Sequence, residues 1–552
     1  MAIVRRWGFN PGAGVLGNVE SVNIIDLSGP SPITSAGVDV ACLVGEFLKG
    51  PFTPREVSGS GDLLSTYGGY SSVVPHADVT NRADGNGLVA LARKKFARLV
   101  ISRVDTRAVT AASGATVATI TLRVVNAGVS SLAQDLVLPA GFRLSDAAVA
   151  TRIVCLAQDY TVPRGSDLTG AGFAITTVEV FFATGVSATA AGANAIDTAL
   201  DSPVTFGFPT STTLTVNTGA VDLFIPAAVS AQDMLSNRYL TAIDRTLPGD
   251  APTNEITIIW SARSTGSAGS VDSIRDRLRT NAVDSSASAR GRRAILRAQP
   301  GTAKPTSNAT AETAFGSGNR SRRCEWVYPH VRFNPVLTDV ITFLDTTDTT
   351  FPAVGADSFM ASILATLPPE NNPGEPALDV LQNILGYEID GSGNNPTGFP
   401  LVVADFINFR TFGMAVLRRD QASGWEFQSG ITSVNPAVDA AGTEAKRTHM
   451  ADFINDSLAA IAARFSKKLA TTERRAALLG EYDRFLSSLR SRNNAALQRV
   501  TDYRIDGAAG NTVALNTAGI YVDLVLVQLL NDMRSLVIQS TIGETVNVTV
   551  LD

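Results

Sequence analysis

The chain ends on residues Glu544–Asp552, ETVNVTVLD, in which Val546, Val548 and Val550 alternate with polar residues. This period of two is typical of a β-strand. The strand is followed by no hairpin turn and no later strand that could pair with it. It must therefore join the edge of a sheet, either in its own domain or on another molecule. We favour an edge on another molecule.

Two amphipathic helices are predicted before this strand. Mostly apolar residues recur at helical spacing in two series, which are Met450, Ile454, Leu458, Ile461, Phe465 and Leu469, and then Leu478, Tyr482, Phe485, Leu489, Asn493, Leu497 and Val500. Thr472 is the expected N-cap of the second helix, and strands are expected near 500–505, 520–529 and 535–541. The sequence thus predicts an α+β domain over residues 431–542 and a strand arm over 543–552.

The first 30 residues resemble the last ten in having a strand pattern and no nearby hairpin partner. Val19–Leu27 (VESVNIIDL) is strand-like, while Pro11 and the glycines around it prevent a helix. We therefore predict a second arm over residues 1–30. The residues predicted to exchange between subunits are Val19, Val22, Ile24, Leu27, Val546, Val548 and Val550, and the predicted hinge glycines are Gly12, Gly14 and Gly17.

The same glycines match a dinucleotide-binding fingerprint, GxGxxG, over Gly12–Gly17. That fingerprint works when a strand precedes it and a helix follows, because the helix N-terminus holds the pyrophosphate. Here a strand follows instead, so a hinge is the better interpretation. The sequence also lacks GxxxxGK[ST], HExxH, CxxC and GxSxG motifs. His76, His330 and His449 are far apart, so we expect no catalytic residues, no metal site and no cofactor.

Between the arms, apolar runs predict a mixed α/β core in two parts, residues 31–105 and 229–430. Val38–Phe47, Arg98–Val104 and Ile256–Trp260 are nearly continuous apolar strands of the kind buried on both faces. Residues 106–228 are rich in Thr, Ala, Val and Gly, and we interpret them as a β-rich inserted domain on the outside of the assembly. Gly301–Gly318 is expected to be a loop. The fold class is therefore multidomain α+β.

Composition agrees with an ordered globular protein. The chain has 552 residues, 45% hydrophobic and 18% charged, with a net charge of −5. No signal-peptide core and no membrane-length apolar run is found, and Cys42, Cys155 and Cys324 are scattered. We therefore expect a soluble protein made in a reducing cytoplasm.

Positive charge gathers in one segment, because residues 263–323 hold twelve basic and four acidic residues, a net of +8. Three interpretations are open: a nucleic-acid patch, a solvated face, or a contact with an acidic surface of a like subunit. Few aromatic residues lie nearby and the chain is acidic, which disfavours nucleic acid. The cluster predicted to contact another subunit is Arg290, Arg292, Arg293, Arg297, Arg320, Arg322 and Arg323.

The order of several short motifs resembles that of contractile tail sheath proteins of bacteriophages and related injection systems. These motifs are Val40–Gly45 with Gly50–Pro51, Asp62–Leu64, Tyr67–Gly69, Arg98–Val104, Val327–Pro329, Leu367–Pro369, Gly424–Phe427 and Gly430–Ser433. The two helices and closing strands of 446–552 match the family best. The resemblance implies a structural protein, not an enzyme, which polymerises around an inner tube and contracts to drive that tube through a cell envelope.

The resemblance also implies the partners and the location. They are further copies of the same chain in a helical homopolymer, the tail tube protein, and baseplate and tail terminator proteins, with no direct nucleic-acid contact and no membrane insertion. The subunit would be assembled in the host bacterial cytoplasm and end in the virion tail sheath. Lys446, Arg464 and Lys467 flank the first C-terminal helix and are candidates to face the tube, although a merely solvated flank explains them equally well. The alternative function is a capsid or surface-layer lattice protein with exchanged arms.

Overall fold

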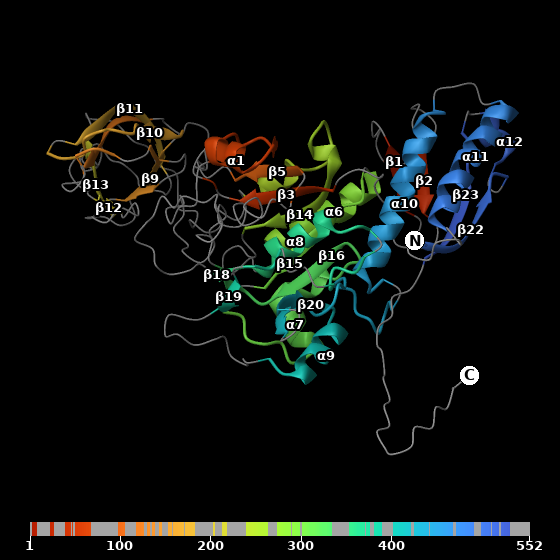
Figure 1. The fold of residues 1–552 in the computed structure, drawn as a ribbon. Helices are drawn as coiled ribbons and strands as arrows, with labels where there is room; N and C mark the ends of the chain where they lie inside the picture. The colour runs from red at the N-terminus through yellow and green to blue at the C-terminus, as the bar shows by residue number, and fades with distance from the viewer. Residues whose placement is uncertain are drawn as a thin grey trace, which may run out of the picture. The chain divides into compact units, whose positions relative to one another are not determined.

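The structure is a computed structural model of all 552 residues. It describes residues 3–7, 22–26, 39–67, 96–104, short stretches between 118 and 217, 239–262, 273–298, 301–333, 353–388, 401–466, 471–490 and 498–529, each with short gaps. These residues fall into two compact units, Met1–Lys467 and Lys468–Asp552. Figure 1 shows their helices and strands.

The first unit is built on an eight-stranded sheet with the order β21-β20-β16-β15-β14-β3-β5-β4 (Figure 1). The six inner strands run parallel, and the edge strands β4 and β21 are antiparallel to their neighbours. The strands are β3 (Val40–Gly45), β4 (Arg55–Val57), β5 (Arg98–Arg103), β14 (Ile256–Ser261), β15 (Arg293–Arg297), β16 (Cys324–Tyr328), β20 (Met414–Asp420) and β21 (Gly424–Phe427). The apolar strands predicted at the centre of the core are thus confirmed.

Both faces of this sheet are buried, which explains its continuous apolar runs. Alternate residues of β3 point to opposite sides, so that Leu43 belongs to one apolar cluster and Cys42 to the other. Helix α8 (Ala356–Thr366) covers the first face and α6 (Ser273–Ser288) covers the second. Every described residue of α8 from Ala356 to Ala365 is buried. The sheet is therefore the centre of two apolar cores.

Smaller elements surround the sheet. They are α1 (Ser60–Tyr67), η1 (Thr253–Glu255), α7 (Asn308–Phe315), η2 (Ser317–Asn319), α9 (Val403–Thr411) and a three-stranded sheet of β17 (Val331–Phe333), β18 (Ala353–Val354) and β19 (Ile384–Tyr387). The expectation of a loop over Gly301–Gly318 is wrong because it contains α7. Ser307 caps α7 by accepting a hydrogen bond from the Thr310 backbone, and Phe315 anchors the helix by stacking on Trp326.

The inserted region is rich in strands, as predicted. A six-stranded antiparallel sheet has the order β12-β13-β6-β11-β9-β8, and β7 pairs with β10. The strands are β6 (Ala118–Val125), β7 (Leu136–Leu138), β8 (Arg143–Ser145), β9 (Ile153–Leu156), β10 (Tyr160–Val162), β11 (Phe173–Phe182), β12 (Ser202–Val204) and β13 (Thr212–Asn217). Asp159 accepts hydrogen bonds from the Arg103 guanidinium and the Gly50 backbone. This ion pair ties the insertion to the end of β5.

The predicted C-terminal helices are present but shorter than expected. Helix α10 (Ala445–Ala463) belongs to the first unit, and α11 (Thr472–Leu489) belongs to the second with β22 (Val500–Asp506), α12 (Val513–Thr517) and β23 (Leu524–Leu529). The periodicity suggested that the second helix reaches Val500, but Val500 begins β22. The N-cap of α11 is Thr471 instead of Thr472. The division between the units falls inside the predicted domain 431–542, and the bounds of the six predicted domains stay predictions.

Candidate functional site

The N-terminal segment has a partner in its own chain. Strand β1 (Ile3–Trp7) pairs antiparallel with β2 (Val22–Asp26), with Arg5 opposite Ile24. The expectation that the N-terminal strand lacks a nearby partner is therefore wrong. The sequence of β1, IVRRW, hides its pairing because two adjacent arginines interrupt the period of two. Strand β1 lies beside α6 and β2 lies beside α10.

Most of the residues predicted to exchange fall outside the described part of the chain. Val22 and Ile24 lie on β2. The others outside the described residues are Val19, Leu27, Val546, Val548, Val550 and the glycines Gly12, Gly14 and Gly17. Strand exchange between subunits thus stays a prediction.

The second unit contains a sheet of two strands. Strands β22 and β23 pair antiparallel, and α11 packs on one side through Leu478, Tyr482 and Leu486. The Tyr503 hydroxyl donates a hydrogen bond to Asp483 of α11, so Tyr503 faces the helix. Among the described residues, each strand of this sheet has a ladder partner on one side only. A two-stranded sheet is marginal alone and gains most from added strands.

The arginine cluster does not form one exposed surface. Arg292, Arg293, Arg297 and Arg323 are each at most 5% exposed. This overturns both the solvated face and the predicted contact with another subunit for these four residues. The run is basic because several of its acidic partners, such as Asp452 and Asp456, come from distant parts of the same chain. The remaining members pair with Asp456 (Arg290), Glu312 (Arg320) and Asp439 (Arg322).

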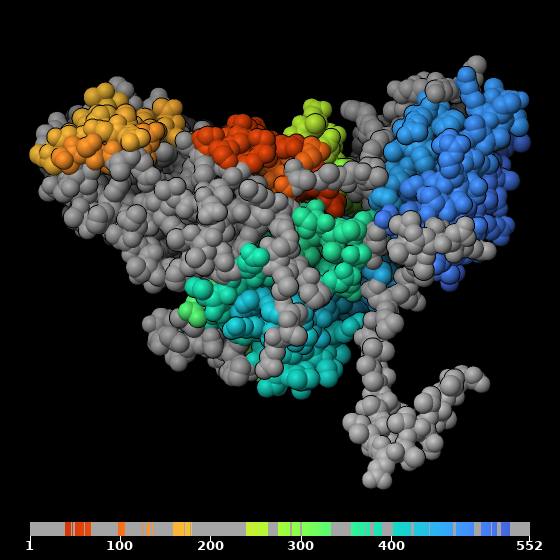
Figure 2. Space-filling model, in the orientation of Figure 1, coloured from red at the N-terminus to blue at the C-terminus, as the bar shows by residue number. Residues whose placement is uncertain are grey.

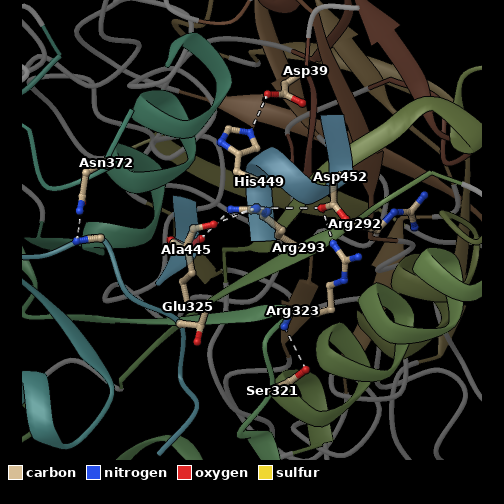
Figure 3. Close-up of polar contacts among 12 residues, drawn as sticks. Asp39, Arg292, Arg293, Ser321, Arg323, Glu325, Asn372, Ala445, His449 and Asp452 are labelled. Carbon is tan, nitrogen blue, oxygen red and sulfur yellow. Dashed lines mark hydrogen bonds and ion pairs between the residues drawn. The ribbon is translucent and has the colours of Figure 1, made fainter. Parts of the chain in front are cut away.

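Several of the arginines hold α10 against the amino ends of β15 and β16 (Figure 3). Arg323 pairs with Asp452 of α10, while Arg290 Nε lies 3.5 Å from Asp456 Oδ2. Arg293 bridges both sides of the contact, because its guanidinium lies 3.2 Å from Glu325 Oε1 and 4.0 Å from Asp452 Oδ2. We call Asp39, Arg290, Arg293, Arg323, Glu325, His449, Asp452 and Asp456 the α10 cluster.

Sequence reasoning missed the acidic half of this cluster. Asp452 and Asp456 lie four residues apart on the buried face of α10, among Met450, Ile454 and Leu458. The spacing of four residues places the two carboxylates on one face of the helix, together with its apolar residues. This pattern is the one sign in the sequence that the carboxylates could be buried. The arginine partner of Asp452 is 129 residues away in the sequence. Nothing local connects them.

Two of the three residues predicted to face a tube lie in the described part of the chain, at opposite ends of α10. Lys446 is half-buried near the start of α10, and Arg464 is exposed just after its end. Lys467 lies outside the described residues. The tube contact therefore stays a prediction.

The histidines form no catalytic arrangement among the described residues. His330 is buried, and burial holds its pKa well below the usual range, so the ring is neutral. His449 Nε2 lies 3.3 Å from Asp39 Oδ2, and His76 is outside the described residues. The described residues contain no group of three or more potential metal ligands, and none of the described helices is long and apolar enough to span a membrane.

A surface that the sequence did not suggest lies on α9. Val403 is 76% exposed and Ile407 is 62% exposed, and they share one side of the helix with Val402 next to it. The opposite side buries Phe409 against the sheet. In the space-filling view, α9 lies at the lower end of the first unit (Figure 2).

Comparison with known proteins gave matches among solved structures only. No family model and no curated protein matches the chain. The chain is similar to sheath proteins of contractile tail systems. A protein in the contracted helical sheath of the anti-feeding prophage has 10% identity and a TM-score of 0.48, covering 97% of this chain and 99% of that one. A protein of the same prophage's baseplate has 9% identity and a TM-score of 0.48, covering 97% and 100%. The sheath tail protein of Desulfitobacterium hafniense has 12% identity and a TM-score of 0.44, covering 91% and 99%.

Proposed function

We propose that this chain is a structural subunit of a contractile tail sheath. It polymerises as a helical cylinder around an inner tube and contracts to drive the tube through a target cell envelope. Its partners are further copies of itself, the tail tube protein, and baseplate and tail terminator proteins. It acts in the tail of a virion or a related particle, after assembly in the host bacterial cytoplasm, and it is not an enzyme.

The observation that carries the proposal is the match between an incomplete sheet and a strand-patterned chain end. The two-stranded sheet β22–β23 has one ladder partner per strand among the described residues. The terminal segment Glu544–Asp552 has the alternation of a strand. Adding that strand to the β22–β23 sheet of a neighbour would join subunits through backbone hydrogen bonds. Such hydrogen bonds persist while rigid units rotate about flexible hinges, which suits a lattice that changes its dimensions.

Substitution of the terminal strand tests this role, with a matched control on its other face. We expect Val546→Asp with Val550→Asp to give a folded subunit that forms no cylinders, because two charges enter the acceptor sheet. The control Asn547→Asp with Thr549→Asp adds the same charge on the opposite face, so cylinders should persist. Circular dichroism monitors folding and negative-stain microscopy detects cylinders.

Deletion of the arms separates the possible outcomes further. Loss of residues 1–28 or of 543–552 should leave a folded subunit without cylinders. Normal cylinders would show that the deleted arm is not the link. For 543–552, a subunit that fails to fold would place the strand in its own sheet, whereas β1 and β2 already pair within the chain. Shells or flat sheets formed by the full chain would instead favour the capsid or surface-layer alternative.

Two further parts of the proposal concern the tube and the insertion. If Lys446, Arg464 and Lys467 contact an acidic tube, replacing all three by glutamate should weaken co-assembly with tube at moderate salt and leave folding unchanged.

If residues 106–228 form an outer domain, their replacement by a short Gly/Ser linker should give a polymerising protein. Asp159→Asn is a milder change than replacing the insertion, because it breaks only the ion pair with Arg103 that ties the insertion to the core.

A further inference from the structure

The inserted region meets the large sheet at a buried arginine. Arg103 is the last residue of β5 and is 1% exposed. Its guanidinium donates hydrogen bonds to both carboxylate oxygens of Asp159, at 2.9 Å and 3.1 Å. Asp159 lies directly before β10 of the insertion, 56 residues further along the chain. A bidentate pair of this kind fixes the orientation of the carboxylate as well as its distance.

On the core side, the contact is formed by a socket of three residues, Gly50, Phe52 and Arg103. The Gly50 backbone N–H donates a hydrogen bond to Asp159 Oδ2 at 3.1 Å, and the Gly50 carbonyl accepts one from Arg103 Nη1 at 2.6 Å. The Arg103 guanidinium also lies 4.6 Å from the centroid of the Phe52 ring. The Asp159 carboxylate therefore binds two separate parts of the core, which are the end of β5 and the loop that follows β3.

The loop that carries Gly50 is held by the core itself. Gly50 has a φ of +104°, and a Cβ atom at this position would lie 2.7 Å from Tyr67 Cδ1. Tyr67 is fully buried at the end of α1, and the centroid of its ring lies 5.2 Å from that of Phe47. Arg245 Nη1 donates a hydrogen bond to the Phe52 carbonyl of the same loop. The position of the socket is therefore set by the core and does not require the insertion.

On the insertion side, Asp159 is held between two paired strands. Strand β9 before it pairs with β11, and β10 after it pairs with β7. Val162 of β10 and Leu138 of β7 are fully buried. A carboxylate on so short a connection has to move together with the strands that it joins. The contact thus links two regions that are each ordered by their own packing.

Opening of the contact is disfavoured by the charge that it would leave behind. Among the described residues, Asp159 is the one carboxylate that pairs with Arg103. Without it, the buried guanidinium keeps only the Gly50 carbonyl and the Phe52 ring. Loss of one partner from a buried ion pair costs far more than the pair contributes when it is intact. The closed contact is therefore strongly preferred.

We propose that the Arg103–Asp159 contact is a rigid joint, through which the β-sheets of the insertion and the eight-stranded sheet move as one body. The insertion is then a fixed extension of the subunit and not a domain that rotates freely about its two chain connections. A joint of this kind transmits rotation of the core to the insertion as a rigid-body movement. It is a property of the single subunit and does not depend on the role in a sheath.

Distances between two spin labels test the joint in the full chain. The labels are attached at S65C on α1 and at S131C in the insertion, because both serines are exposed. A C155S background leaves Cys42 and Cys324, which are buried and do not react. Double electron–electron resonance should then give one narrow distance peak. A broad distribution in this otherwise unmodified chain would overturn the joint, because the insertion would move despite the contact.

Substitution of the carboxylate completes the test. D159A removes both acceptors of the bidentate pair, so the narrow peak should be lost. D159N keeps the size of the side chain but not its charge, and it should also lose the narrow peak, which keeps the test decisive if D159A does not fold. D167A is the matched control, because Asp167 accepts hydrogen bonds from Thr169 within the insertion, and the narrow peak should persist. Circular dichroism checks that each variant is folded.

Two further outcomes would overturn the joint. One is a narrow peak that persists in every folded variant of Asp159, since the contact would then not set the position of the insertion. The other is a loss of the peak in D167A as complete as in D159A, since the insertion would then loosen for reasons unrelated to Arg103.

Discussion

Two β-sheets, one before α10 in the sequence and one after α11, differ in the number of their strands and in how far their faces are buried. The eight-stranded sheet is buried on both faces, and its edge strands β4 and β21 are short and antiparallel to their neighbours. The β22–β23 sheet has two strands and packs on one helix, with Leu526 44% exposed on its other side. Among the described residues, the first sheet therefore encloses two apolar cores, whereas the second has only two strands, which is marginal for a sheet on its own.

The largest expected effect is a difference in the free energy of unfolding lost on substituting a residue in each of the two sheets. Trp260 of β14 is fully buried and stacks on Phe96, so Trp260→Ala should lower the free energy of unfolding by about 3–5 kcal/mol. Leu526→Ala on β23 should change it by less than about 1 kcal/mol in the isolated subunit. Urea unfolding followed by circular dichroism measures both. Equal losses would mean that the second sheet is as complete as the first.

A comparable loss is expected from the buried charges that dock α10. Asp452→Ala leaves Arg323 buried without its carboxylate, which should cost about 3 kcal/mol or more. The control Asp439→Ala removes a carboxylate from the partly exposed Arg322 and should cost less than about 1 kcal/mol. Thermal unfolding of both variants compares them. A small loss for Asp452→Ala would show that α10 is held by its apolar residues alone.

The sequence predicts the complete sheet better than the incomplete one. VACLVG and ITIIW are apolar at every position because both faces are covered, and such runs are visible without a structure. The sequence does not show that the arginines of 290–323 are buried, because a run of charged residues is ordinarily exposed to solvent. The partners Asp452 and Asp456 lie more than a hundred residues away in the sequence. Helix α7 was missed because Gly/Thr/Ala/Ser composition resembles a loop, although Ser307 caps it. Local patterns report burial, but they do not report long-range partners.

The pH dependence of the second unit is expected to follow Asp523. Burial raises the pKa of Asp523 to about 6, above the value of the unfolded chain. A carboxyl group whose pKa is raised on folding favours the folded state at low pH, so its contribution is lost as the pH rises from about 4 to 6. Asp523→Asn should flatten the pH profile of this unit in that window. Hydrogen exchange of residues 500–529 measures it, and an unchanged slope would contradict the assignment.

The smallest effect concerns the helix that covers the incomplete sheet. Tyr503→Phe removes the hydrogen bond to Asp483 of α11, which should cost about 0.5–1 kcal/mol because the bond is exposed to water. Tyr503 faces α11, so this change should leave assembly unaffected. Cylinders that fail to form from Tyr503→Phe, seen by negative-stain microscopy, would show that assembly also requires the helix-facing side of β22.

We propose that the terminal strand of one subunit completes the β22–β23 sheet of another. Subunits labelled with ¹⁴N and ¹⁵N are mixed before assembly, and their carboxyl groups are joined by a dihydrazide cross-linker. Glu544 and Asp552 flank the terminal strand, while Asp502 and Asp506 lie on β22. If the strand is exchanged, cross-links between these two pairs should carry one light and one heavy peptide. Cross-links that only ever join peptides of the same isotope would place the strand in its own subunit and rule out strand exchange.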